Sequence, residues 1–369
     1  MTIIIDAMSG DNAPKEIVRG AVLAAKNAKP ETHFILVGDT DTVTQELKAA
    51  GGASLLSEGR ISIAHAEDVL TMEDNPFDVV KKKKNSSMAT ALRMLADGTG
   101  DALVSAGNTG ALFTGASMIV RCVKGVRRAG IAALIPFDRP LLLMDAGANV
   151  TVTAEYMEQF AIMGSVYMEK LYAIDSPVVG LANNGTESHK GTPVITEAYE
   201  RLRANETIRF AGNIEGKEVP FGKCDVLVAD GFTGNIILKL IEGMGSFFMK
   251  RMKRMLYANV YTKLSALVLK KELKQLKDDF DPSETGGSPF LGISKPVIKA
   301  HGSADARAIM NACRQATAYV ENNISEEIVR RIAESKQAYA EKISAEKLSA
   351  EQISADKPAA EAETANAAE

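Results

Sequence analysis

Tryptophan is absent from the 369-residue sequence, and aromatic residues make up only 5% of it. Proteins that hold single-stranded nucleic acid by base stacking favour exposed aromatic faces. The composition therefore argues against such a protein, and we expect no nucleic-acid partner. The formal net charge of −4 is matched by the segment from Glu334 onward, where eight acids face four bases, so global charge indicates no partner either.

Cysteines and long apolar runs are also scarce. Cys122, Cys224 and Cys313 are far apart, and no pair has the spacing of metal ligands. Asp6 interrupts the first apolar run, which reads as a strand rather than a secretory signal. No stretch approaches the roughly 18 apolar residues of a spanning helix. We therefore expect a protein of the reducing cytoplasm, without a metal site, that lies on a membrane surface if it meets a membrane.

The common nucleotide-binding motifs are missing. The sequence contains no G-x-x-x-x-G-K-[ST], and no G-x-G-x-x-G follows the first predicted strand. The segment 185–192 resembles a phosphate-binding loop only superficially. A nucleotide-driven or NAD-dependent reaction is therefore disfavoured, and we expect no cofactor.

Short apolar runs alternate with longer amphipathic stretches up to about Lys250. This alternation predicts an α/β protein, a three-layer α/β/α fold with a mostly parallel sheet. The predicted strands are 2–6, 33–37, 61–64, 101–105, 141–145, 178–181, 208–211 and 225–229. Helices are expected between them, for example over 14–28, 86–96, 108–122, 154–171 and 192–203. The stretch 297–303 is expected to be a last strand that runs into a helix from 304 to about 330.

Several predicted strands end in a small or acidic residue that is followed by a Gly/Asn/Thr-rich turn and a helix start. Such turns can aim free backbone N–H groups at an anion. Ligands of open α/β sheets bind at the carboxyl ends of the strands. The repetition predicts a site for phosphate or an oxyanion, formed by Asp6, Gly10, Asp11, Gly107, Asn108, Thr109, Gly110, Asp145, Asn149, Asp230, Thr233, Gly234, Asn235 and Ser303. The alternative is that each turn is only a tight connection, with Asp145 and Asp230 as helix caps.

Two further side chains suit this chemistry. Lys190 could supply a balancing positive charge. His301, near a helix start, could bind an anion or move a proton. His33 and His65 lie on or beside strands and are expected to be structural.

The segment 245–281 reads as one or two basic helices that protrude from the fold. Phe248, Met252, Met255 and Leu256 share a face beside four cations, Lys250, Arg251, Lys253 and Arg254. This pattern suits an anionic membrane surface or an acidic protein. A dimer-forming helix with a solvated basic face is an equally good reading. The run Lys81–Lys84 is expected to be a solvated helix face.

The chain is expected to divide into a catalytic domain, 1–333, and a low-complexity tail, 334–369. In the tail an apolar residue recurs every five positions, at Ile343, Leu348 and Ile353. Five residues turn a helix by roughly 140°, so these residues form no single stripe. We expect no packed helix beyond about Lys342, and a disordered or partly helical extension.

Motifs at 5–14, 83–88, 105–110, 145–150, 159–167, 212–216, 230–235 and 298–303 occur in an order that resembles one family over about residues 1–330. It is that of the bacterial phosphate acyltransferases of phospholipid synthesis (acyl-acyl-carrier-protein:phosphate acyltransferases, PlsX). Ser9 and Asn12 stand where the family has Gly and His, and the 183–191 loop is less regular than the family's acidic version.

The resemblance implies that inorganic phosphate attacks the thioester of acyl-acyl-carrier-protein, which yields acyl phosphate and free carrier. A membrane-bound acyltransferase then passes the acyl group to glycerol 3-phosphate. The family is cytoplasmic, homodimeric and peripherally associated with the inner face of the membrane. Its fold is similar to those of isocitrate/isopropylmalate dehydrogenases and phosphotransacetylases. By this reading Thr233 and Asn235 bind phosphate, and Asn108 and Thr109 bind phosphate or the oxyanion. Lys190 neutralises charge, and His301 assists proton balance.

Three rival functions remain open from the sequence. A phosphotransacetylase-like enzyme would use acyl-CoA in place of the carrier protein. A dehydrogenase of the isocitrate type would need acidic metal ligands and an Arg-rich clamp, which we cannot assemble here. A non-enzymatic alternative is a membrane-surface scaffold built around 245–281.

Overall fold

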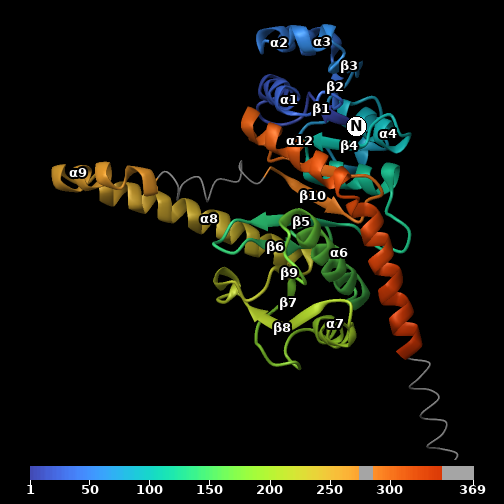
Figure 1. Cartoon of the computed structure of the whole chain (residues 1–369), viewed down its shortest axis with the longest axis vertical. Coiled ribbons are helices and arrows are strands. Elements are labelled where there is room, and N and C mark those ends of the chain that lie inside the picture. Colours follow the sequence, from blue (N-terminus) through green and yellow to red (C-terminus); the bar gives the residue numbers. More distant parts are fainter. Residues whose placement is uncertain (274–285, 343–369) are drawn as a thin grey trace, which may run out of the picture.

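The computed structural model describes residues 1–273 and 286–342. In this part of the chain, eleven strands form one sheet in the order β3-β2-β1-β4-β11-β10-β5-β6-β9-β7-β8 (Figure 1). The strands are β1 (Thr2–Asp6), β2 (His33–Gly38), β3 (Ile61–His65), β4 (Ala102–Ser105), β5 (Gly130–Ile135), β6 (Leu141–Met144), β7 (Val178–Asn183), β8 (Arg209–Glu215), β9 (Val226–Val228), β10 (Ser288–Leu291) and β11 (Val297–Lys299).

The sheet consists of two parallel groups that run in opposite directions. Strands β3, β2, β1, β4 and β11 form the first group. Strands β6, β9, β7 and β8 form the second. Between them, β10 and β5 pair antiparallel with each other and with their outer neighbours. The expected mostly parallel sheet is confirmed, although its reversal was not predicted.

Helices cover both faces of the sheet, so the predicted three layers are confirmed. In β1, Ile3 and Ile5 join a core with α1 (Lys15–Asn27) and α12 (Ala306–Glu321), whereas Ile4 joins a core with α4 (Ser87–Ala96) and α5 (Thr109–Gly115). This alternation follows from the two-residue period of a strand. In the second group, α6 (Ala154–Tyr172) covers one face and the start of α8 (Gly231–Leu256) the other. Other α-helices are α2 (Thr40–Ala49), α3 (Ala53–Ser57), α7 (Pro193–Ala204) and α9 (Val260–Val268).

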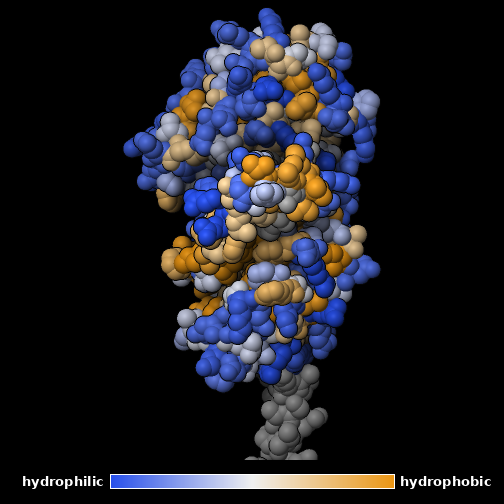
Figure 2. Space-filling view, turned by 90° about the vertical axis from the view of Figure 1, so that its left-hand side faces the viewer, coloured by the Kyte–Doolittle hydropathy of each residue, from blue (hydrophilic) through white to orange (hydrophobic). Residues whose placement is uncertain are grey.

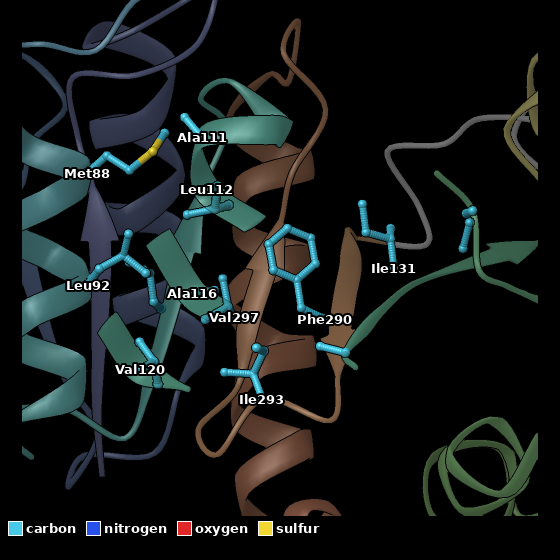
Figure 3. Close-up of a cluster of buried hydrophobic side chains, with 14 of the residues drawn as sticks. Met88, Leu92, Ala111, Leu112, Ala116, Val120, Ile131, Phe290, Ile293 and Val297 are labelled. Atoms are coloured by element: carbon cyan, nitrogen blue, oxygen red, sulfur yellow. The ribbon is translucent and has the colours of Figure 1, made fainter. Parts of the chain in front are cut away.

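Strand β10 links the two strand groups through the buried ring of Phe290. Figure 3 shows Phe290 between Leu112 of α5 and Ile131 of β5. Phe113 packs edge-on against the same ring, with centroids 5.2 Å apart. Strands β5 and β10 were both missed in the sequence. Pro289 argues against a strand by the usual rule.

Helix α8 is a single helix that begins directly after β9 and carries the basic residues in its second half. With α9 it forms an arm that projects from the body (Figure 1). Figure 2 looks at the molecule from the side to which the arm points, where hydrophobic and hydrophilic residues lie side by side. The protruding basic helices are therefore confirmed as far as residue 273, and 274–281 lie outside the described residues.

The chain continues after α12 in a helix over 324–342. Ile324, Ile328 and Ile332 are buried in it, and the Ser335 hydroxyl accepts a hydrogen bond from the Asn205 amide at 2.9 Å. The helix thus runs without a break across the expected domain boundary at 333. The five-residue pattern lies outside the described residues. Among the described helices, none is long and apolar enough to cross a membrane.

Candidate active site

The carboxyl ends of both strand groups open onto one cavity of about 1130 Å³. Neighbouring strands rotate by roughly 20–25°, and this twist turns the opposed ends toward each other. The polar end of the cavity is lined by Thr109 after β4, Lys299 and His301 at the end of β11, Gly147 after β6, and Asn235 in the second turn of α8. Of the predicted phosphate and catalytic residues, Thr109, Asn235 and His301 therefore come together.

The rest of the cavity has an apolar wall. One side is β5, with Ile131, Ala133 and Ile135, and the other is a stripe on α8. The stripe follows the 3.6-residue period of a helix and consists of Leu238, Ile241, Gly245, Met249, Met252 and Leu256. Lys250 and Lys253 also line the cavity, whereas Arg251 and Arg254 are not among its lining residues.

The loop after β6 is organised by the buried carboxylate of Asp145. Its Oδ1 accepts hydrogen bonds from the backbone N–H groups of Ile131, Gly147 and Ala148 at 3.0–3.1 Å. Its Oδ2 accepts from the N–H and the side-chain amide of Asn149 at 2.7 and 2.8 Å. The expectation of free N–H groups is wrong for this loop, because the aspartate takes them.

The loop after β9 repeats this arrangement. Asp230 is the N-cap of α8, and its Oδ1 accepts from the N–H groups of Phe232 and Thr233 at 2.9 Å. The Thr233 hydroxyl donates to Asp230 Oδ2 at 2.7 Å. The interpretation of Asp230 as a helix cap is confirmed, and the N–H groups expected to be free are again occupied. Gly234 lets α8 approach the neighbouring loop, since a Cβ there would lie 1.9 Å from the Asp145 carbonyl oxygen.

The loops after β4 and β1 are held in a similar way. Asn108 caps α5, its Oδ1 accepting from the Ala111 N–H at 3.0 Å while its amide donates to the Met72 carbonyl at 2.8 Å. Ser105 Oγ donates to the buried Asp6 at 2.8 Å, and the Gly107 N–H donates to Ser105 Oγ at 3.2 Å. None of Asp6, Gly10, Asp11, Gly107, Asn108 and Gly110 lines the cavity.

The turn after β11 lies against the loop after β1. The Asp11 N–H donates to the Gly302 carbonyl at 2.8 Å. His301 is exposed on the cavity wall, with Nδ1 2.9 Å from the Ser303 hydroxyl. Lys190 is an exposed residue of the loop after β7, where its carbonyl accepts from the Asn183 amide at 3.0 Å, and it is not among the cavity-lining residues.

Sequence reasoning missed Lys299, the last residue of β11. Its side chain is only 8% exposed, and its Nζ donates to the carbonyls of Ala106, at 3.3 Å, and Ala300. Burial lowers the pKa of Lys299 to about 8. The residue lies inside the 298–303 motif, but a single strand residue does not reveal whether it faces the core or a cavity.

The arrangement suits a ligand with an anionic head and a long apolar part. Lys299 and His301 lie at one end, and the α8 stripe provides the apolar wall. Across the described ranges 1–273 and 286–342, no group of three or more His, Cys, Asp or Glu residues could hold a metal ion.

Comparison with solved structures identifies the fold. A phosphotransacetylase from Streptococcus pyogenes superposes with a TM-score of 0.59 at 17% identity, covering 87% of this chain and 94% of that one. The EutD phosphotransacetylase from Staphylococcus aureus gives a TM-score of 0.56 at 15% identity, with the same coverage. The predicted likeness to phosphotransacetylases is confirmed.

Comparison with known sequences identifies the family. The model of a family described as "Fatty acid synthesis protein" matches residues 1–327. A phosphate acyltransferase from Caldanaerobacter subterraneus subsp. tengcongensis is 41% identical over 345 residues, 93% of this chain and all of that protein. One from Bacillus subtilis is 39% identical over 338 residues, 91% of this chain and 99% of that protein. The chain therefore belongs to the phosphate acyltransferase (PlsX) family.

Proposed function

We propose that the protein transfers an acyl group from acyl-acyl-carrier-protein to inorganic phosphate, forming acyl phosphate and free carrier thiol. The observation that carries this proposal is a cavity whose cationic end meets a long apolar wall. A phosphate fits the first part and an acyl chain the second. A cavity for a short acyl group would need no apolar stripe that runs from Leu238 to Leu256.

The chemistry asks little of the protein beyond binding and orientation. Phosphate is the nucleophile, so no serine or cysteine nucleophile is required. The leaving thiol has a pKa of roughly 8.5 and departs largely as thiolate. Catalysis then rests on holding phosphate against the thioester carbonyl and on stabilising the tetrahedral oxyanion.

In this scheme Asn235 and Thr109 donate to phosphate or to the oxyanion, and His301 assists proton balance. All three line the polar end of the cavity. Asp145, Asp230 and Asn108 act indirectly, since they fix the loops. The charge-neutralising role of Lys190 stays a prediction, as do the phosphate contacts of Thr233 and Ser303.

The arm would connect the site with its partners. Its exposed apolar residues include Phe247, Phe248, Met255, Tyr261 and Leu264. Together with Lys250, Arg251, Lys253 and Arg254 they suit the acidic carrier protein or the anionic inner face of the membrane. We propose a cytoplasmic, peripherally bound homodimer whose acyl phosphate feeds a membrane-bound glycerol-3-phosphate acyltransferase.

The decisive assay incubates the purified protein with acyl-acyl-carrier-protein and phosphate and traps acyl phosphate with hydroxylamine. We expect hydroxamate that depends on phosphate, and its absence would refute the proposal. Equal turnover with acyl-CoA would favour a phosphotransacetylase-like enzyme instead. Asn235→Ala should raise the KM for phosphate, and an unchanged value would remove Asn235 from the site.

A matched pair of variants on α8 tests the acyl wall. Met252 lines the cavity, whereas Met255, 63% exposed, is not among the lining residues. Each buried methylene contributes about 0.8 kcal/mol, so losing the contact of two lowers kcat/KM by about tenfold. Met252→Asp should show this loss for long-chain donors and little loss for short ones. Met255→Asp should affect long-chain and short-chain donors alike, and a loss confined to long-chain donors in this variant would contradict the assignment of the wall.

A further inference from the structure

Lys299 is a buried cation without an anionic partner. No ion pair recorded for residues 1–273 and 286–342 includes it. Its Nζ donates to the carbonyls of Ala106 and Ala300. An ammonium group has three N–H donors. Two carbonyl contacts leave one donor over, and the side chain lines the cavity.

A buried ammonium group with an unused N–H donor destabilises the fold unless a ligand supplies an acceptor and a negative charge. Taking an ammonium out of water is repaid only when charge and hydrogen bonds are matched. Lys239, which also lines the cavity, is exposed and forms an ion pair with Glu242 at 2.8 Å. Of the two, Lys299 is the one held by the core of the fold with its charge unmatched.

The charged groups around Lys299 come from several elements. Asp6 of β1 and Asp11 of the following loop act on its charge and raise its pKa, while Lys239 of α8 lowers it. Burial is the largest effect and lowers the pKa to about 8. His301, two residues further on, lines the same end of the cavity. The pKa of Lys299 therefore lies within the range in which phosphate binding can be measured.

We propose that Lys299 binds the phosphate nucleophile, with its ammonium group donating to a phosphate oxygen at the polar end of the cavity. The inference rests on the proposed function and adds the cation that the sequence motifs did not supply. The third N–H then has an acceptor, and the buried charge has an anion. Thr109 and Asn235 complete the contacts from the neighbouring loops.

This arrangement links phosphate binding to a proton. Bound dianion favours the charged amine, so binding raises the pKa of Lys299 above its value in the free protein. The affinity for dianionic phosphate should be constant below about pH 8 and fall by up to tenfold per pH unit above it, until the pKa of the complex is reached. The second ionisation of phosphate is expected at lower pH.

The test measures binding of inorganic phosphate to the full chain by calorimetry from pH 7 to 9.5. Lys299→Met should weaken binding at pH 7 by about 10- to 100-fold, as expected for a lost charge-assisted hydrogen bond, and abolish the alkaline decline. Lys295→Met is the matched control. Lys295 also donates to a backbone carbonyl, that of Gly100 at 2.9 Å, but precedes β11 and does not line the cavity.

Wild-type affinity for Lys299→Met overturns the inference, as does a flat wild-type profile up to pH 9.5 or no measurable phosphate binding by the wild type. If Lys299→Met fails to fold by circular dichroism, the wild-type profile decides alone. The hydroxamate assay separates the two proposals. Product formation with unchanged binding in Lys299→Met refutes only the role of Lys299. Lys299-dependent binding without product refutes only the acyl transfer.

Discussion

Replacing Asp145 by asparagine should destabilise the protein strongly, whereas the same change at Asp230 should not. Asparagine at 145 keeps one acceptor oxygen, which can serve the three N–H groups now bound to Oδ1. Its amide nitrogen then faces the N–H and the amide of Asn149, which are both donors. The two hydrogen bonds to Oδ2 are lost in this best arrangement.

The magnitude follows from these contacts. Hydrogen bonds to a charged group contribute about 1.5–3 kcal/mol each, so Asp145→Asn should lower the free energy of unfolding by about 3–6 kcal/mol. This is a large share of the roughly 5–15 kcal/mol that stabilises a typical protein.

Asp230→Asn provides the control. The remaining oxygen still accepts from Phe232 and Thr233, and the new amide can donate to the Thr233 hydroxyl. Asparagine caps helices about as well as aspartate. The loss is limited to the charge at the helix start, about 0.3–1 kcal/mol.

Urea unfolding followed by far-ultraviolet circular dichroism measures both changes, since the chain has no tryptophan to report. The two variants should keep the slope of the wild type and differ in midpoint. A loss below about 1 kcal/mol in Asp145→Asn, or equal losses in the two variants, would refute the hydrogen-bond argument.

Three further predictions follow from local geometry. Gly234→Ala should lower the free energy of unfolding by about 1–3 kcal/mol or more and weaken phosphate binding, because the new Cβ would clash with the Asp145 carbonyl. Gly243→Ala lies on the same helix with nothing within 4 Å of its Cβ, so in urea unfolding it should raise that free energy by about 0.5–1 kcal/mol. An unchanged stability of Gly234→Ala would contradict the close approach of α8 to the Asp145 loop. Asp6→Asn removes a charge that raises the pKa of Lys299, so the alkaline decline in phosphate affinity should move to lower pH, and a shift to higher pH would contradict the coupling. Burial raises the pKa of Cys224 and Cys313 to about 12, so at pH 8 a thiol reagent should label half-buried Cys122 first in the native protein and all three in urea; early labelling of Cys313 would disagree.

Much of the fold follows from the sequence because its strands are short, apolar and regularly spaced. Ile3, Ile4 and Ile5 predict a strand buried on both faces, and the structure buries all three. Strand β10 was hidden by Pro289 and the glycines before it. The reversal between the two strand groups depends on β5 and β10, so it could not be read from the parallel units.

The sequence predicted which loops surround the candidate site but not the roles of the charged residues in it. The turns that begin at Asp145 and Asp230 lie beside the cavity, but their N–H groups are bound by those aspartates. Composition cannot reveal this, because an aspartate that caps a loop and one that faces a ligand look alike in sequence. Lys299 was missed for the converse reason, since a lysine in a strand is ordinarily solvated.

The continuity of α8 sets the angle at which the arm meets its surroundings. About 39 Å of helix joins Asp230 to Leu256, and it contains no proline. One residue inserted after Gly243 would leave Asn235 in place and turn every later side chain by about 100° around the axis. Phe248, Arg251 and Met255 would then take the places of Met249, Met252 and Leu256 on the cavity wall, and the apolar stripe would be broken. The number of residues between Asp230 and each side chain of the arm thus determines which side chains face the cavity and which face outward.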